Sequence, residues 1–232
     1  MYKAILLFHI LAGTVALGSG LLAIFAAKGR KNHNRSGRTY ELSMYAVALS
    51  ALLLSSLKFN PSLLAIGVFA LYLTYTGKRA LFYFRLRETY TPGLQDKLPS
   101  LAGLLTGLLM IGFPIAQILI SGKLFVPVLA VFGLVLLGSS AGDLISFRKP
   151  DLFRPGNKAW LLKHIGMMGG AYISTVTGFL VNNVQIGQQW LIWIGPTLIG
   201  TVLIARSTMQ WRQKLQLTPP KPGFAKEKAT VV

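Results

Sequence analysis

Four residues of this sequence have side chains that bind metal ions or carry protons, and they are His33, Glu41, Asp143 and His164. Imidazole nitrogens and carboxylate oxygens bind zinc or iron, and pairs of them relay protons inside membrane proteins. Their spacings match no compact motif such as HExxH, so they can form one site only where the fold gathers distant segments. We consider them candidate metal ligands at the cytoplasmic face of a membrane.

Ordinary ion pairs are the competing interpretation of the same residues. Asp143 would pair with Lys163 or with an arginine of a loop. Glu41 would pair with Arg38, and His33 would be solvated. A charged side chain inside a membrane span costs about 2.5–3.5 kcal/mol on insertion scales, so Asp143 is expected to have a partner or a task in either case.

His164 and Asp143 are the two candidates that we expect to lie in contact. Each is expected about one turn inside the same membrane face, on two segments that a short charged loop joins. Consecutive helices joined in this way are usually antiparallel neighbours. We therefore predict a direct or water-bridged contact between them, with Arg35 or Arg38 closing over the pair.

The segment 158–183 has ligand-capable side chains and small residues at helical spacing. The ligand-capable side chains are His164, Met168, Tyr172, Thr175 and Asn182, and the small residues are Gly166, Gly170, Ser174 and Gly178. Residues three and four apart share one face of a helix, and a ladder of small residues lets two backbones approach closely in lipid. We therefore predict that this segment is the central and most buried helix of a bundle.

His9 belongs to the first apolar run and is a further ligand-facing candidate, together with Met168, Tyr172, Thr175 and Asn182. At 1.5 Å per residue, His9 and His164 lie roughly 20 Å apart in depth, so they cannot share a haem or a metal ion. We expect His9 to bond a neighbouring helix, and Asn182 or Asn183 lies at a matching depth.

The composition indicates an integral membrane protein. Of 232 residues, 53% are hydrophobic and 13% are charged, and the apolar residues gather in seven long runs. The runs cover about 4–27, 40–57, 62–82, 100–120, 124–147, 158–183 and 189–205. Runs of this length predict an all-α bundle of seven transmembrane helices, residues 1–217, followed by a mobile basic cytoplasmic tail, 218–232. The absence of cysteine excludes disulfides and thiolate metal sites.

The basic residues predict how the bundle is oriented. The net charge of +18 would suggest nucleic acid in a soluble protein, but here the basic residues lie in short loops between apolar runs. Lys3, Lys58 and Lys123 fall on one side and all other Lys and Arg on the other. The positive-inside rule then places the N-terminus outside and the C-terminus inside. The expected partners are the bilayer and the anionic headgroups of its cytoplasmic face, with no nucleic acid.

Three blocks of the chain resemble one known family. The run His9–Met44 carries His-x-x-Ala-Gly in its first span and then the loop HNRSGRTY, where Asn34 separates the histidine from the arginine of the family pattern. The blocks LYLTYTGKRAL, Leu71–Leu81, and HIGMMGGAYISTVTGFLVNN, His164–Asn183, are similar too. The resemblance is to a family of uncharacterised bacterial multi-pass membrane proteins. It implies a bacterial cytoplasmic membrane and names no substrate or cofactor.

Two classes of function follow from these observations. The first is a non-catalytic membrane protein that binds or moves a small ligand, an ion or a lipid through the helix bundle. The second is a metal- or haem-dependent membrane enzyme, redox or hydrolytic, with its site at the cytoplasmic face. The two classes differ in whether His33, Glu41, Asp143 and His164 converge.

Overall fold

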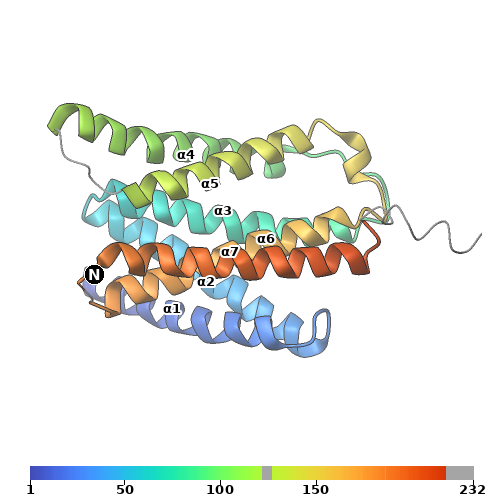
Figure 1. The fold of residues 1–232 in the computed structure, drawn as a ribbon, viewed down its shortest axis with the longest axis horizontal. Helices are drawn as coiled ribbons and strands as arrows, with labels where there is room; N and C mark the ends of the chain where they lie inside the picture. Colours follow the sequence, from blue (N-terminus) through green and yellow to red (C-terminus); the bar gives the residue numbers. More distant parts are fainter. Residues whose placement is uncertain (122–126, 186, 218–232) are drawn as a thin grey trace, which may run out of the picture.

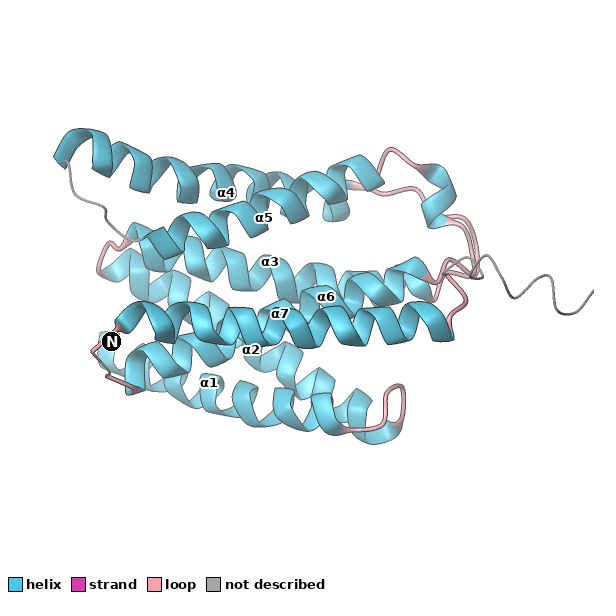
Figure 2. Ribbon diagram, in the orientation of Figure 1, coloured by secondary structure: helices cyan, strands magenta, loops and turns pink. Residues whose placement is uncertain are grey.

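The computed structural model describes residues 1–121, 127–185 and 187–217, and this part of the chain folds into seven long helices that alternate in direction (Figure 1). They are α1 (Tyr2–Phe25), α2 (Lys31–Leu57), α3 (Pro61–Phe84), α4 (Leu94–Ser121), α5 (Pro127–Ser146), α6 (Ala159–Asn183) and α7 (Gln189–Lys214). A short 3-10 helix, η1 (Pro150–Phe153), interrupts the link from α5 to α6. No strand occurs among the described residues, so the all-helical fold is confirmed (Figure 2). The predicted tail, 218–232, lies outside them.

Five helices are long and apolar enough to cross a membrane: α1, α2, α4, α5 and α7. Their outward faces carry many exposed leucine, isoleucine, valine and phenylalanine side chains, which suits contact with lipid. α3 and α6 are equally long but are not among these five, and several of their polar side chains bond to other helices, as described below. The structure thus agrees with a multi-pass membrane protein, and the count of seven spans stays a prediction.

The most buried helix is α3, so the prediction that segment 158–183 would hold this place is wrong. α3 contacts α2, α4, α5 and α6, and Figure 1 shows α4 and α5 on one side of it and the remaining helices on the other. Ten described residues of α3 are buried, from Gly67 to Tyr83, against three in α6. The reason is that α6 packs on α1, α3 and α7 and stays half exposed between these contacts.

Three helices extend beyond the apolar runs that predicted them. α2 begins at Lys31, so most of the expected basic loop 28–40 is helix. α4 begins at Leu94, six residues before the expected start, and α7 continues to Lys214. A helix that leaves the hydrocarbon keeps its backbone hydrogen bonds but no longer needs apolar side chains, so hydropathy alone cannot locate its true end.

The close contacts between helices use glycines, but not the predicted ladder of α6. A β-carbon at Gly166 or Gly178 would meet no atom within 4 Å. The tightest backbone approach joins α4 and α5, where a β-carbon at Gly107 would lie 2.9 Å from the Leu137 nitrogen and 3.0 Å from the Gly133 oxygen. This pair lets the two backbones approach closely, as small residues do between helices in lipid.

Large side chains pack onto glycines from both sides of the α6 interfaces. On α6 itself, a β-carbon at Gly169 would lie 2.7 Å from the Ile204 side chain of α7. A β-carbon at Gly77 of α3 would lie 2.9 Å from Met168 Sδ and 3.0 Å from Met167 Cβ. Gly200 of α7 receives the side chain of Ile173 in the same way. Methionine and isoleucine therefore fill hollows that bare backbone provides.

The contact between Gly107 and Gly133 gives a first prediction. Gly107→Ala should lower the free energy of unfolding by about 1–3 kcal/mol, because the new methyl group meets backbone atoms that cannot turn away. Thermal unfolding in mild detergent measures the effect. Gly112→Ala, on the same helix with open space around it, is the control and should cause no loss. Equal effects of the two changes would contradict the α4–α5 contact.

Candidate functional site

Asp96, in the first turn of α4, is the most densely bonded side chain of the structure. Its carboxylate is fully buried and accepts hydrogen bonds from Arg79 Nε at 2.6 Å, Tyr83 OH at 2.5 Å, Tyr90 OH at 2.7 Å and the Gly93 nitrogen at 2.8 Å. The bond from Gly93 also satisfies a free N–H group at the start of the helix. Asp96 therefore fixes the start of α4 to the end of α3.

Arg79 is held in one orientation by the same cluster. Its Nη2 donates to Tyr90 OH at 2.8 Å, and its guanidinium carbon lies 4.2 Å from the centroid of the Phe82 ring. A planar guanidinium suits this combination of ion pair and ring contact, which a lysine ammonium could not reproduce.

Asp143, near the end of α5, forms the second buried ion pair. It accepts a hydrogen bond from Tyr72 OH of α3 at 2.7 Å and forms an ion pair with Lys163 Nζ of α6. The pairing with Lys163 confirms the ion-pair interpretation of this residue. His164 is the next residue on the helix and points about 100° away, so the predicted pair of His164 with Asp143 is wrong.

Aromatic rings cover the two ion pairs at this end of the bundle. Tyr83, Tyr90, Phe153 and Trp160 form one buried group, with Tyr83 and Trp160 centroids 4.6 Å apart. The Trp160 indole donates to the Leu152 oxygen at 2.7 Å, which ties the α5–α6 link to α6. Such a cover keeps water away from the ion pairs and strengthens them.

The space between the ion pairs is too small for a ligand. A cavity of about 10 Å³ separates them, lined by Asp96, Asp143, Arg79 and Lys163 among others. A volume of this size corresponds to about one water molecule. The two pairs therefore connect α3, α4, α5 and α6 as a structural network.

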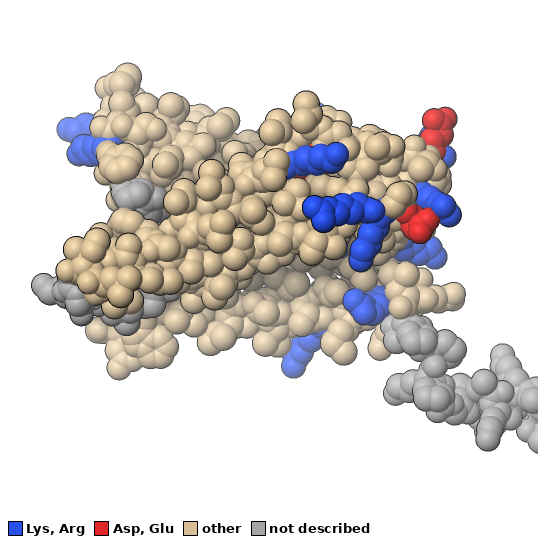
Figure 3. All heavy atoms as spheres, turned by 90° about the horizontal axis from the view of Figure 1, so that it is seen from above, with Lys and Arg blue, Asp and Glu red and all other residues tan. Residues whose placement is uncertain are grey.

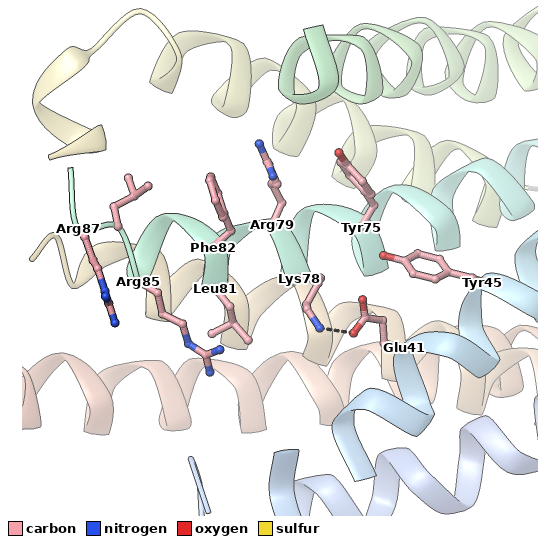
Figure 4. A pocket seen from close by; sticks show the side chains of 10 residues that line it. Glu41, Tyr45, Tyr75, Lys78, Arg79, Leu81, Phe82, Arg85 and Arg87 are labelled. Carbon is pink, nitrogen blue, oxygen red and sulfur yellow. Dashed lines mark hydrogen bonds and ion pairs between the residues drawn. The ribbon is translucent and has the colours of Figure 1, made fainter. Parts of the chain in front are cut away.

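A larger cleft opens on the surface along the second half of α3 (Figure 4). Its volume is about 590 Å³, and it is lined by Glu41 and Tyr45 of α2 and by Tyr75, Lys78, Arg79, Leu81, Phe82, Arg85, Leu86 and Arg87. Four of these side chains are cationic and one is anionic. The cleft is therefore a basic site of the size at which small ligands bind.

The single carboxylate of the cleft neutralises only one of its cations. Glu41 Oε2 lies 2.5 Å from Lys78 Nζ, in place of the predicted partner Arg38. Arg79 is paired with Asp96. Arg85 and Arg87 are exposed, and no acidic side chain of the described residues forms an ion pair with either of them.

The two histidines among the candidates lie close to the cleft, and both bond to backbone. His33 Nδ1 donates to the Ala23 oxygen at 2.9 Å and caps the end of α1, so His33 is not simply solvated. His164 Nδ1 donates to the Gly77 oxygen at 2.8 Å. The ring of His164 lies within electrostatic range of His33, Lys78 and Arg85. The end of α3 thus gathers positive charge, and no group of three or more metal-binding side chains occurs in the described ranges.

The ligand-facing candidates lie at contacts between helices, and none of them lines the cleft. His9 Nδ1 donates to the Val47 oxygen at 3.1 Å and lies 2.9 Å from Ser50 Oγ, so it bonds α2 rather than Asn182 or Asn183. Tyr172 OH donates to the Leu17 oxygen at 3.2 Å.

The other three candidates lie on α6. Met168 fills the hollow at Gly77, and Thr175 donates to the Ala171 oxygen at 2.9 Å, with Met44 Sδ 3.1 Å away. Asn182 donates to the Gly178 oxygen of its own helix. The stripe predicted from the sequence thus serves packing.

The residues that sequence reasoning missed are Asp96 and Arg79. The predicted apolar run begins at about residue 100, so hydropathy does not show that α4 already begins at Leu94. The signal that could have found Asp96 is its place three residues after Gly93, where an acidic side chain typically caps a helix.

Comparison with protein-family models, with curated proteins and with solved structures finds no match.

The buried pair of Asp143 and Lys163 gives a second prediction. Lys163→Met should lower the free energy of unfolding by about 3–5 kcal/mol, because it leaves the Asp143 carboxylate buried without a cation. Adding Asp143→Leu to that variant should restore much of the loss. Lys78→Met, which removes a half-exposed ion pair, is the control and should cost far less. Strictly additive effects in the double variant would contradict the pair.

Proposed function

We propose that this chain is a seven-span protein of a bacterial cytoplasmic membrane, with its N-terminus outside and its C-terminus inside. We propose further that it binds a small anionic ligand in the basic cleft at its cytoplasmic end. It thus belongs to the first of the two classes of function, the proteins that bind or move a small ligand, an ion or a lipid.

The distribution of charge supports the seven spans and their orientation. Figure 3 shows Lys, Arg, Asp and Glu gathered mainly over one end of the molecule, with a few cations at the other end and a broad uncharged surface between. α3 and α6 would cross the membrane within the bundle, since Arg79 of α3 pairs with Asp96 of α4 and Lys163 of α6 pairs with Asp143 of α5. A span of this kind needs little hydrophobicity of its own.

The excess of cations in the cleft is the observation that supports the ligand. Arg85 and Arg87 form no ion pair with an acidic side chain of the described residues, and a guanidinium binds carboxylate or phosphate oxygens through two parallel hydrogen bonds. Tyr45, Tyr75 and Phe82 give the same cleft apolar walls. Few polar groups placed on an apolar lining are typical of sites for small molecules.

The alternative, a metal- or haem-dependent enzyme, draws no support from the side chains. Its four candidate ligands point to four different partners. His33 and His164 donate to backbone oxygens, while Glu41 and Asp143 each hold a lysine.

The orientation gives a third prediction, and the lack of native cysteine makes it simple to test. A membrane-impermeant maleimide added to intact cells should label Phe59→Cys, in the turn between α2 and α3, but not Arg154→Cys, between η1 and α6. Both side chains are well exposed. Permeabilised cells should show labelling at both positions. The reverse pattern in intact cells would mean that the topology is inverted.

Ligand binding gives a fourth prediction. Dihexanoylphosphatidylglycerol below its micelle concentration, or glycerol 1-phosphate, should raise the unfolding temperature of the purified protein, and salt should weaken the effect. Arg85→Gln with Arg87→Gln should abolish it. Arg148→Gln with Lys149→Gln, which removes two exposed cations outside the cleft, is the matched control and should preserve it. If neither probe acts through Arg85 and Arg87, the proposed function is wrong.

A further inference from the structure

The surface of α2 continues the cleft with an apolar track. Leu49 and Leu53 follow Tyr45 at intervals of four residues, so the three side chains lie one above the other on the helix. Leu49 and Leu53 are each 55% exposed, and Tyr45 lines the cleft. At 1.5 Å per residue, the track extends about 12 Å from Tyr45, in the middle of α2, toward the end of the helix at Leu57, away from Arg85 and Arg87.

Polarity therefore changes in one direction along this surface. Arg85 and Arg87 lie at the end of α3 that faces the proposed cytoplasmic side, and Tyr45 and Tyr75 lie deeper. The exposed leucines of α2 follow deeper still. The surface changes from cations to aromatic rings and then to aliphatic side chains. These three zones match, in the same order, the phosphate, the interfacial region and the acyl chain of a phospholipid.

The basic side chains of the cleft can converge on one phosphate group. In Figure 4, Lys78 and Arg85 extend to the same side of α3, and Arg87 follows them at the end of the helix. Lys78 is 48% exposed although it is paired with Glu41, so its ammonium keeps donors for a second acceptor. A phosphate carries enough oxygens to bind all three side chains.

We infer that the cleft binds the headgroup of an anionic phospholipid from the cytoplasmic leaflet, with an acyl chain along Tyr45, Leu49 and Leu53. This inference rests on the proposed function, because it requires the cleft to bind anions and to lie at the cytoplasmic face. A soluble anion would use the arginines but would leave the leucine track bare. A zwitterionic lipid would bring an ammonium group toward two arginines that have no acidic partner, which disfavours it.

The headgroup is tested by native mass spectrometry of the full chain released from detergent. Dioleoylphosphatidylglycerol should bind roughly tenfold or more tightly than dioleoylphosphatidylcholine. Arg85→Gln with Arg87→Gln should reduce its binding by roughly 25-fold, at about fivefold for each cation removed. Arg148→Gln with Lys149→Gln should leave it unchanged. Where the double variant does not fold, Arg85→Gln and Arg87→Gln are measured singly, and each should give about a fivefold loss.

The acyl chain is tested by the leucine track. Leu49→Ser with Leu53→Ser should weaken binding of the phosphatidylglycerol, whereas Leu105→Ser with Leu109→Ser, at equally exposed positions of α4, should not. Dihexanoylphosphatidylglycerol should bind at least tenfold more tightly than glycerol 1-phosphate. Equal binding of these two probes, with no effect at Leu49 and Leu53, would overturn the lipid but leave an anion site in place. If Arg85→Gln with Arg87→Gln also left the binding of both probes unchanged, the anion site would be overturned as well.

Discussion

The structure depends on the rule that a charged group buried away from water must find its partner within the protein. Asp96 and Asp143 are the two carboxylates that face this demand, and they meet it in the same way. Each accepts a hydrogen bond from a tyrosine of α3 and forms an ion pair with a partly buried cation, which is Arg79 for Asp96 and Lys163 for Asp143. Four helices are joined by these bonds. Because α3 provides both tyrosines and one cation, it becomes the central helix.

The same pairing explains why a basic cleft remains on the surface. Four of the five acidic residues in the described part of the chain are engaged with a cation, and only Glu41 of these faces the cleft. The carboxylates that could neutralise the end of α3 are turned inward, toward Arg79 and Lys163. Arg85 and Arg87 are therefore left without acidic partners. In our account the structural network and the proposed lipid site lie on two sides of α3.

The sequence predicted the helices well and their arrangement poorly. Apolar runs locate helical segments because the hydrocarbon requires about 20 apolar residues for each span. They cannot show that α3 would be central, since its burial depends on the partners of Tyr72 and Tyr83. The ladder of small residues in α6 was misleading because Gly166 and Gly178 have open space around them. The close contacts use Gly77 and Gly200 of the neighbouring helices and Gly169, which is not part of the ladder. Glycine spacing shows where a backbone can approach, but not which helix approaches it.

For the candidate site, residue types were a better guide than assumed geometry. Glu41 lines the cleft and His164 lies beside it, while His33 caps α1 near by. The sequence left two possible partners for Asp143, Lys163 or an arginine of a loop. The structure shows the pair with Lys163. Asp96 was missed because helix α4 begins before its apolar run. Hydropathy gives no information about the polar turns at the ends of spans, although several of the side chains that form ion pairs and hydrogen bonds lie there.

The packing of α3 against α6 is the central claim, and a disulfide tests it directly. A β-carbon at Gly77 would lie 3.0 Å from Met167 Cβ, so a shift of about 0.5–1 Å gives the Cβ–Cβ separation of about 3.5–4.5 Å that a disulfide requires. The chain has no native cysteine to interfere. Gly77→Cys with Met167→Cys should therefore crosslink rapidly in membranes under mild oxidation, which intact mass spectrometry detects. Gly77→Cys with Gly166→Cys should not crosslink, since the β-carbon position of Gly166 has open space around it. Crosslinking of the second pair in preference to the first would contradict the position of α6 on α3.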